Sequence, residues 1–376
     1  MNIMIIAGEA SGDLHGSGVV RELKRMVSSC NICGIGGDGM RETGCNLIYH
    51  VEQFAFMGLV EVVRHLPFIR TALRRLEQSF KECRPDVLIL VDYPDFNLRL
   101  ARIARRYDIP VLFYISPQIW AWRPNRVNKI VDLVDCMAVV FPFEVDLYER
   151  AGGRVEFVGH PLLEELGTRY GRAPFCHEAG LDPAHPIVGL LPGSRPQEVS
   201  RLLPPMTATI AAIRKEMPDV QGVIGLAPTV SPREAASLTE GTVEIPMVKD
   251  LTYEVMRHAD LLLVASGTAT LESACFGTPL FVLYKLARLS WWIGKRMVSI
   301  PNIGLVNVVA GRRIVPEFLQ HDVRPDLLAP EAIAWLRDPE RLAQIREDLQ
   351  EVRTKLGTPG ASERVAALAM ELAGVR

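Results

Sequence analysis

The sequence lacks any apolar run long enough to cross a membrane. A transmembrane helix needs roughly 18 or more consecutive apolar residues, and the hydrophobic stretches of this chain of 376 residues are all shorter. Residues 1–8 contain no cationic segment and begin at once with a strand pattern, so we expect no signal peptide. Together these absences make the cytoplasm the expected compartment.

The chain also lacks an excess of charge of one sign. It has 42 Lys and Arg against 44 Asp and Glu, which gives a net charge of −2. A dedicated nucleic-acid binder is usually basic, so we expect no nucleic-acid partner. Hydrophobic residues make up 48% of the sequence, enough for a sizeable core, and the length favours two domains.

Paired metal ligands are missing as well. The seven cysteines are irregularly spaced, which is typical of reduced thiols. Cys30 and Cys33 form a close pair without a second pair beside it, so a structural zinc site is not expected. The sequence contains no Asp-x-Asp, the carboxylate pair that holds a metal in many sugar-nucleotide enzymes. We therefore predict neither a metal nor a cofactor.

Strand and helix patterns alternate along both halves of the chain. Strands are expected at 3–7, 31–34, 87–91, 111–115 and 137–140, and again at 187–191, 220–226, 243–247, 261–264 and 280–283. Helices are expected between them, including 16–26, 66–82, 96–106 and 143–150, and at the end over 339–356 and 361–372. Such alternation predicts α/β domains with parallel sheets.

The economical architecture is two doubly wound domains that face each other across a cleft. We expect domains at 1–163 and 186–350, a linker rich in Gly, Pro and charge at 164–185, and a helical tail at 351–376.

One turn in the second half has the pattern of an anion site. Apolar residues 261–264 predict a buried strand, and Ser266, Gly267 and Thr268 follow it before a helical pattern. Free N–H groups at a helix start suit a diphosphate. Glu272, one turn into that helix, is placed to accept hydrogen bonds from a ribose. The alternative is an ordinary turn with a capping Ser or Thr.

A second turn strengthens the nucleotide interpretation. Gly193, Ser194 and Arg195 follow the strand pattern 187–191, and Glu198 comes next in a helical pattern. Arg195 has the donor geometry of a phosphate clamp, although a surface ion pair with Glu198 is the alternative. Because turns at the carboxyl ends of parallel strands meet in one crevice, the two turns predict one nucleoside-diphosphate site.

Two glycine-rich loops occur in the first half. Residues 34–39 match G-x-G-x-x-G, the dinucleotide pattern, but they fall in the second β-α unit and no acid follows at the usual distance. Residues 8–13 follow the first strand, lack the Lys of a P-loop, and are expected to open onto the cleft. The candidate substrate-binding residues of this loop are Gly8, Glu9, Ser11 and Gly12.

The first half also supplies a candidate general base. Asp95 lies shortly after the strand pattern 87–91, and a carboxylate at such a position is well placed for proton abstraction. Asp92 is the competing carboxylate. The alternative for Asp95 is a cap on a helix that begins at Phe96.

Two basic amphipathic segments suit a membrane surface. Residues 59–75 mix Leu59, Val60, Val62, Val63, Leu66, Phe68 and Ile69 with Arg64, Arg70, Arg74 and Arg75. Residues 286–298 place Trp291 and Trp292 beside Arg288, Lys295 and Arg296. The alternative is a pair of core-facing helices with solvated arginines.

With these residues in view, the chain resembles the lipid A disaccharide synthases of Gram-negative bacteria. The resemblance covers essentially the whole chain and depends on motifs at 8–13, 92–97, 116–122, 157–161, 191–195 with Glu198, 266–272, and 301–303 with Asn307 before 310–312. It implies a GT-B fold, with the last helix returning to the first domain, and an inverting, metal-independent glycosyltransferase without cofactors.

The resemblance also implies substrates and location. The donor would be UDP-2,3-diacylglucosamine and the acceptor 2,3-diacylglucosamine 1-phosphate, joined into a β-1,6-linked disaccharide 1-phosphate with release of UDP. The enzyme would work as a peripheral protein on an anionic membrane surface, at the cytoplasmic face of the inner membrane. Homodimer formation is left open.

Site roles follow from the same resemblance. Asp95 would be the general base, Arg195 a contact to the diphosphate or to the acceptor phosphate, and Glu272 the ribose ligand. The functional asparagine would be Asn307, with Asn302 as its competitor. The rival function is a UDP-N-acetylglucosamine 2-epimerase on the same fold, which would leave the aromatic and basic segments without a purpose.

Overall fold

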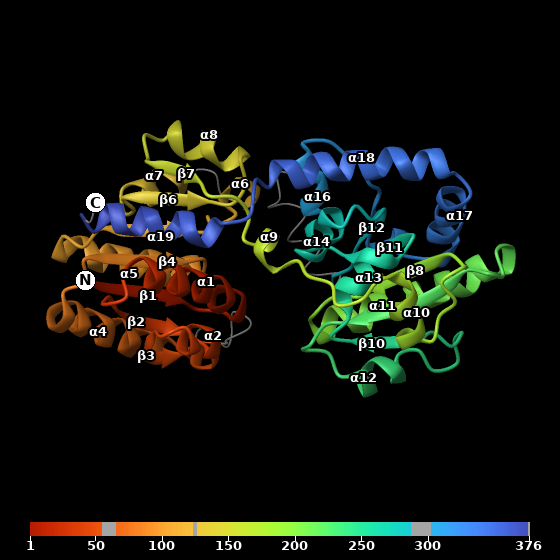
Figure 1. The fold of residues 1–376 in the computed structure, drawn as a ribbon, viewed down its shortest axis with the longest axis horizontal. Coiled ribbons are helices and arrows are strands. Elements are labelled where there is room, and N and C mark those ends of the chain that lie inside the picture. Colours follow the sequence, from red (N-terminus) through yellow and green to blue (C-terminus); the bar gives the residue numbers. More distant parts are fainter. Residues whose placement is uncertain (55–64, 123–125, 287–301, 375–376) are drawn as a thin grey trace. The chain divides into compact units, whose positions relative to one another are not determined.

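The computed structural model describes residues 1–54, 65–122, 126–286 and 302–374. The chain forms two compact units. Unit 1 comprises Met1–Glu164 together with Gly357–Arg376, and unit 2 comprises Glu165–Leu356. Each unit has its own parallel sheet with helices around it (Figure 1).

Unit 1 contains a parallel sheet of seven described strands in the order β3-β2-β1-β4-β5-β6-β7. The strands are β1 (Asn2–Ala7), β2 (Asn31–Gly36), β3 (Asn46–His50), β4 (Val87–Val91), β5 (Val111–Tyr114), β6 (Cys136–Val139) and β7 (Val155–Phe157). Strands β4, β5 and β6 are buried along their whole length, as near-continuous apolar runs predict for strands covered on both faces.

The helices of unit 1 cover both faces of this sheet. They are α1 (Ala10–Met26), α2 (Asp38–Glu42), α4 (Leu66–Cys83), α5 (Pro94–Ala104), α6 (Ile119–Trp122), α7 (Val127–Val131), α8 (Phe143–Glu149) and α9 (Leu162–Glu165), with 3-10 turns η1 (Val51–Phe54) and η2 (Arg105–Tyr107). Alternate strand residues such as Met4, Ile6 and Leu90 share one core cluster with Leu76 of α4 and Leu100 of α5.

The last helix, α19 (Ala361–Leu372), belongs to unit 1, as expected, and packs against α1, β4 and β5 (Figure 1). The Glu164 carboxylate fixes its start: Oε1 accepts hydrogen bonds from the backbone N–H groups of Gly360 (3.0 Å) and Ser362 (2.9 Å), and Oε2 accepts one from the Ser362 hydroxyl (2.7 Å). These bonds satisfy N–H groups that a helix start leaves without partners.

Unit 2 contains a parallel sheet of six described strands in the order β10-β9-β8-β11-β12-β13. The strands are β8 (Ile187–Leu191), β9 (Gln221–Leu226), β10 (Met247–Lys249), β11 (Leu261–Ala265), β12 (Leu280–Tyr284) and β13 (Glu317–Leu319). The helices are α10 (Arg172–Ala179), α11 (Pro196–Glu216), α12 (Pro232–Ser237), α13 (Thr252–His258), α14 (Ala269–Cys275), α16 (Leu305–Ala310), α17 (Pro325–Leu336) and α18 (Pro339–Lys355), with the 3-10 turn η4 (Gln320–Asp322).

The structure corrects several expected elements. Strands β3, β7 and β13 were not predicted; all three are short and only partly buried, so their apolar patterns are weak. The strand expected at 243–247 lies later, at Met247–Lys249, and follows Pro246 at an edge of the sheet. Helix α10 lies inside the expected linker.

Charged contacts hold α10 on unit 2. The Arg172 guanidinium donates to the His258 carbonyl (2.6 Å) and the His185 carbonyl (3.2 Å), and it pairs with the Asp260 carboxylate (3.1 Å).

No helix in the described ranges is both long enough and apolar enough to span a membrane.

Candidate active site

A cavity of unit 2 lies at the carboxyl edge of its sheet, where ligands of open α/β sheets bind. It has a volume of about 610 Å³, and its walls include Leu191 at the end of β8, Gly225 of β9, Asp250 after β10 and Ala265 of β11. It also collects every residue that the sequence analysis placed at a donor site except Arg195. These residues are Gly193, Ser194, Glu198, Ser266, Gly267, Thr268 and Glu272.

The turn after β8 depends on its glycine. Gly193 has a φ of +107°, and a Cβ there would lie 2.6 Å from Glu198 Oε2 and 3.4 Å from the Ala265 Cβ. The turn leads directly into α11, whose N-cap residue is Arg195. Ser194 therefore lies next to the amino end of a helix of 21 residues, where unpaired N–H groups and the helix dipole favour an anion.

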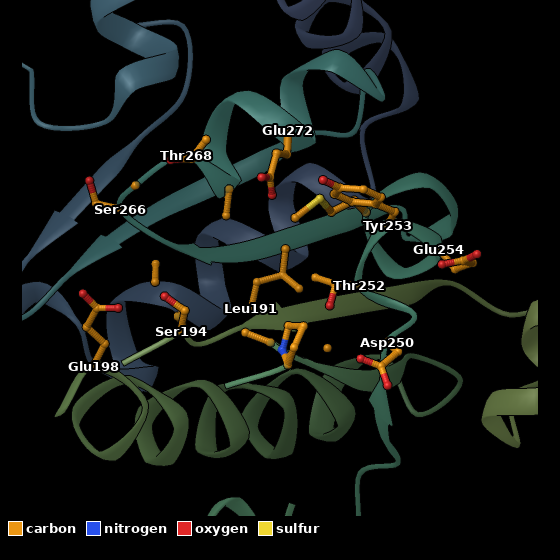
Figure 2. Close-up of a pocket in the computed structure, with 18 of the residues that line it drawn as sticks. Leu191, Ser194, Glu198, Asp250, Thr252, Tyr253, Glu254, Ser266, Thr268 and Glu272 are labelled. Atoms are coloured by element: carbon orange, nitrogen blue, oxygen red, sulfur yellow. The ribbon is translucent and has the colours of Figure 1, made fainter. Parts of the chain in front are cut away.

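The turn after β11 does not follow the capping alternative. Thr268 is the N-cap residue of α14, but its hydroxyl makes no cap hydrogen bond within the described residues. The Ser266 hydroxyl donates to the Ile303 carbonyl (3.3 Å), which ties this turn to the chain ahead of α16. Figure 2 shows Ser194, Glu198 and Ser266 gathered at one end of the cavity.

Glu272 extends from α14 into the same cavity, close to Tyr253 (Figure 2). Burial, and next the nearby Glu165 carboxylate, raise the pKa of Glu272 to about 7. Burial and the charge of Glu272 also raise the pKa of the Tyr253 hydroxyl. The charged form of such a buried carboxylate is stabilised by a ligand that donates hydrogen bonds to it, and the hydroxyls of a ribose are such donors.

Arg195 is placed differently from its neighbours. Its side chain is 66% exposed, does not line the cavity, and pairs with Glu198 (Nη1 to Oε1, 3.2 Å). The structure therefore contains the surface ion pair that was the alternative to a phosphate clamp. Such an exposed pair contributes only about 0–1 kcal/mol to stability. Arg195 could therefore leave Glu198 and bind a phosphate at little cost in free energy.

The residues at the end of the cavity opposite Ser194 and Ser266 were not predicted from the sequence. Asp250, Thr252, Tyr253 and Glu254 lie there (Figure 2), together with Arg169 from the expected linker. Glu254 is 3% exposed, and its Oε1 accepts a hydrogen bond from the Arg169 backbone N–H (2.7 Å). Asp250 has a φ of +61°, a strained conformation for a residue other than glycine. No local pattern points to these residues, because the fold brings them together.

Asn307, the expected functional asparagine, makes four hydrogen bonds within unit 2, and its role in the reaction stays a prediction. It is fully buried; its Nδ2 donates to the Val315 carbonyl (2.9 Å) and to Glu317 Oε1 (2.8 Å), while its Oδ1 accepts from the N–H groups of Ile314 (2.9 Å) and Val315 (3.1 Å). All its hydrogen-bonding capacity is used in folding this loop, and none is left for a substrate in this conformation. Its competitor Asn302 is only partly buried.

In unit 1 the two glycine-rich loops are joined by a carboxylate. Asp13 of α1 accepts hydrogen bonds from the backbone N–H groups of Gly37 (2.6 Å), Gly39 (3.1 Å) and Met40 (3.0 Å). The loop that matches the dinucleotide pattern thus already holds an anion supplied by the protein itself, which argues against the dinucleotide alternative.

The loop at residues 8–13 packs closely on the protein. A Cβ at Gly8 would collide with the Tyr93 ring, and one at Gly12 would lie 3.3 Å from the Ala7 Cβ. Glu9 is the N-cap residue of α1, and Ser11 is exposed in the first turn of that helix. Their role in substrate binding stays a prediction.

The turn just before the candidate base, which contains the competing carboxylate Asp92, is strained. Asp92 and Tyr93 have φ values of +47° and +49°, and Asn97 Nδ2 donates to the Asp92 carbonyl (2.6 Å), which holds the turn. Burial, and next the charge of Glu9, raise the pKa of Asp92 to about 6. Strain and a raised pKa are both common at functional sites.

Asp95 lies in the first turn of α5, which begins at Pro94 with Tyr93 as its N-cap residue. The expected alternative, Asp95 as the cap of a helix starting at Phe96, is therefore wrong. The Asp95 side chain is 84% exposed, and its Oδ1 lies 3.6 Å from Arg126 Nη2. Its carboxylate is thus open to a ligand, whereas Asp92 is more enclosed.

The motif at 116–122 rests on a buried polar cluster. The Ser116 and Tyr148 hydroxyls are 2.8 Å apart, and Trp120 Nε1 donates to Glu144 Oε1 (3.2 Å). Burial raises the pKa of Glu144 to about 8. The cluster fixes the position of α6 against α8.

The described part of the first amphipathic segment faces the core. Ile69 is 9% exposed in the core cluster, and the Phe68 ring packs on Tyr49 and Phe54 at 5.8 and 5.2 Å between centroids. Arg70 and Arg74 are exposed. This part of α4 therefore agrees with the core-facing alternative. Residues 59–64, including Arg64, and the Trp291 segment lie outside the described residues.

Known proteins resemble this chain over nearly its whole length. The family model described as lipid-A-disaccharide synthetase matches residues 3–372. The lipid-A-disaccharide synthase of Geobacter sulfurreducens is 45% identical over 373 residues, which cover 99% of this chain and 97% of that protein.

Solved structures share the fold at low identity. The UDP-GlcNAc 2-epimerase of Neisseria meningitidis, bound to UDP-GlcNAc, matches with a TM-score of 0.66 and 13% identity over 99% of this chain and 100% of its own. The glycotransferase of kitacinnamycin matches with a TM-score of 0.66 and 16% identity over 99% and 98% of the two chains. At such identity the likeness shows the GT-B fold alone, and the epimerase likeness does not extend to activity. Because the family model covers nearly the whole chain and a curated relative shares 45% of its residues, this chain belongs to the lipid-A-disaccharide synthetase family.

Proposed function

We propose that this chain is a metal-independent, inverting glycosyltransferase that transfers a diacylglucosamine from its UDP donor to 2,3-diacylglucosamine 1-phosphate. Membership of the lipid-A-disaccharide synthetase family supports the reaction. The single observation in the structure that supports it most is the cavity of unit 2, which gathers two strand-end turns and Glu272 around one space.

The donor would lie along this cavity from one end to the other. Its diphosphate would contact the turns at Ser194 and at 266–268, next to the amino end of α11. Its ribose would donate hydrogen bonds to Glu272, and its base would reach toward Arg169 and Tyr253. The N. meningitidis epimerase, which has a similar fold, was solved bound to UDP-GlcNAc, and this is consistent with a UDP-sugar donor.

The acceptor would be activated in unit 1. Asp95 would take the proton of the acceptor 6-hydroxyl as its oxygen forms a bond to the anomeric carbon of the donor, on the face opposite the diphosphate. The bond between that carbon and the diphosphate oxygen breaks, UDP leaves, and the configuration inverts. Backbone N–H groups, joined by Arg195 once it leaves Glu198, would stabilise the negative charge on the leaving group. Asp92 is the alternative base.

The two substrates would be held by different halves of the chain. Residues 1–163 would hold the acceptor and the base, and residues 186–350 the donor. Both substrates carry acyl chains, so the protein would work as a peripheral enzyme on the cytoplasmic face of an anionic membrane, alone or as a homodimer. Residues 59–64 and 287–298, outside the described ranges, are its candidate membrane contacts.

A product assay tests the function. Radiolabelled UDP-2,3-diacylglucosamine is incubated with the protein, with and without the acceptor, and the products are separated by thin-layer chromatography. A disaccharide 1-phosphate that forms only with the acceptor supports the proposal. A change of the donor sugar without the acceptor would instead identify an epimerase, and binding of UDP without any product would identify a sensor.

A further inference from the structure

A second cavity, which we call the α5–α7 pocket, lies in unit 1 beside the candidate base. It has a volume of about 200 Å³. Leu98, Ile130 and Leu133 form an apolar part of its wall, and Asp95 also lines it. The remaining side chains that line it are Pro94 and four cations, Arg99, Arg102, Arg126 and Lys129.

The four cations come from two short stretches of sequence. Arg99 and Arg102 are three residues apart on α5, and Arg126 and Lys129 are three residues apart at α7, so each pair lies on one face of its helix. Packing of the two helices brings the pairs to a single pocket, an arrangement that neither stretch shows by itself.

These cations lack the acidic partners that neighbouring cations have. Further along the same segment, Arg105 pairs with Asp135 (3.3 Å) and Arg106 with Glu77 (3.4 Å). Within the pocket only Arg126 has an acidic partner among the described residues, namely Asp95 at 3.6 Å. The other three, Arg99, Arg102 and Lys129, make no ion pair or side-chain hydrogen bond in the described structure. Like charges that converge without counter-ions repel one another, and a bound anion would relieve that repulsion.

We propose that the α5–α7 pocket binds the phosphate monoester of the acceptor sugar. This inference rests on the proposed function and adds the residues that recognise one substrate. A phosphate monoester carries between one and two negative charges near neutral pH and three strong acceptor oxygens. Arginine forks match such oxygens, and the pocket is too small for a whole nucleotide. The apolar wall suits the carbon face of a sugar or the start of an acyl chain.

The position of Asp95 gives the pocket a role in the reaction. In the acceptor, the phosphate is on C1 and the attacking hydroxyl is on C6, which is attached to C5. The ring oxygen joins C1 and C5, so the phosphate and the hydroxyl lie near one another, and Asp95 is among the residues that line the pocket. A phosphate held by Arg99 and Arg102 would therefore keep the nearby 6-hydroxyl within reach of Asp95. Arg126 contacts the base from the pocket side. Its movement from Asp95 to the phosphate would leave Oδ1 free to accept the hydroxyl proton.

The test compares two acceptors in detergent micelles, 2,3-diacylglucosamine 1-phosphate and the same lipid without its phosphate. The variant carries Arg99→Ser together with Arg102→Ser. A hydrogen bond to a charged group contributes about 1.5–3 kcal/mol, so the KM for the phosphorylated acceptor should rise by about 10- to 150-fold or more. The KM for the donor should stay unchanged, and the variant and the unaltered protein should use the phosphate-free acceptor equally well.

The matched control carries Arg21→Ser together with Lys81→Ser. Both residues are exposed cations of unit 1 and lie outside the pocket. This control should leave both KM values unchanged. Equal losses for the two acceptors in the Arg99/Arg102 variant would mean a structural role and would overturn the proposal.

A phospholipid headgroup is the other source of the same chemistry. If the Arg99/Arg102 variant loses binding to phosphatidylglycerol vesicles, relative to phosphatidylcholine vesicles, and keeps a normal KM for phosphorylated acceptor in micelles, the pocket serves the membrane and the proposal is wrong.

A binding measurement separates this inference from the proposed function. Glucosamine 1-phosphate is titrated with protein, and the width of its ³¹P resonance is followed. Broadening with the unaltered protein that disappears in the Arg99/Arg102 variant would support the pocket even if no disaccharide formed. Disaccharide formation with no preference for the phosphorylated acceptor in either protein would leave the function standing and reject the pocket.

Discussion

The ionised carboxylate of Glu272 should lower the stability of the folded protein and, at the same time, increase its affinity for the nucleotide. Its pKa is raised from 4.5 to about 7 by burial and by Glu165. The difference of about 2.5 pKa units corresponds to about 3 kcal/mol, at about 1.36 kcal/mol for each unit. A carboxyl whose pKa is raised in the folded state prefers to stay protonated there. Ionisation therefore lowers stability progressively between about pH 4.5 and pH 7, and the full loss is present above pH 7.

Glu272→Gln removes this charge and keeps the shape of the side chain. At pH 8 the variant should be more stable than the unaltered protein, by up to about 3 kcal/mol in urea unfolding, and at pH 4 the two should be nearly equal. Uridine binding, which involves no phosphate, should weaken in the variant at pH 8 by about 1.5–3 kcal/mol, because a charged acceptor for the ribose hydroxyls is lost.

Calorimetric titration with uridine and urea unfolding at the two pH values measure both effects. Glu234→Gln is the control, since Glu234 is an exposed acid of the same unit on α12, and it should change neither quantity. A variant that is less stable at pH 8, or that binds uridine with unchanged affinity, would refute the reasoning and place the ribose elsewhere.

The general base, the leaving group, the nucleobase end of the cavity and the buried Asn307 can each be tested as well. Asp95→Asn should keep UDP binding and lose about 10²–10⁴-fold in turnover; normal turnover, with a large loss in Asp92→Asn instead, would transfer the role to Asp92. Activity should survive removal of divalent ions by EDTA, and a loss restored only by Mg²⁺ or Mn²⁺ would contradict a mechanism based on N–H groups and arginine. Arg169→Ala should weaken uridine and UDP binding by the same factor, whereas a loss for UDP alone would mean that Arg169 contacts the diphosphate. Asn307→Ala should destabilise the protein by about 2 kcal/mol or more, because buried backbone groups lose their partners; unchanged urea unfolding would be inconsistent with the hydrogen bonds seen here.

Much of the fold could be predicted because a short continuous run of apolar residues is enough to identify each central strand. Strands β4, β8 and β11 are continuous apolar runs, and each is buried along its whole length. Edge strands such as β3 and β10 have only one strand neighbour among the described residues and are partly exposed, so their residues need not be apolar. Their positions were missed or shifted for that reason.

Some residues of the candidate site could also be predicted from short stretches of sequence, whereas others could not. Gly193 and Ser266 stand directly after buried strands, and a short sequence is enough to place them at the carboxyl edge of a sheet. Arg169 and Glu254 are 85 residues apart and meet only in the folded unit. No periodicity or motif links them, so sequence reasoning assigned Arg169 to a linker and passed over Glu254.

By itself, the sequence determined two α/β halves, the strand-end turns and the resemblance to a glycosyltransferase family, because each depends on residues that are near one another along the chain. Tertiary structure alone decided what the side chains do. It occupied, within unit 2, every hydrogen bond that the Asn307 amide can form. It filled the dinucleotide-like loop with the carboxylate of Asp13. It also joined two pairs of cations from separate helices into one pocket beside Asp95. Burial, charge and hydrogen bonding act through space, and the distances that govern them exist only once the chain has folded.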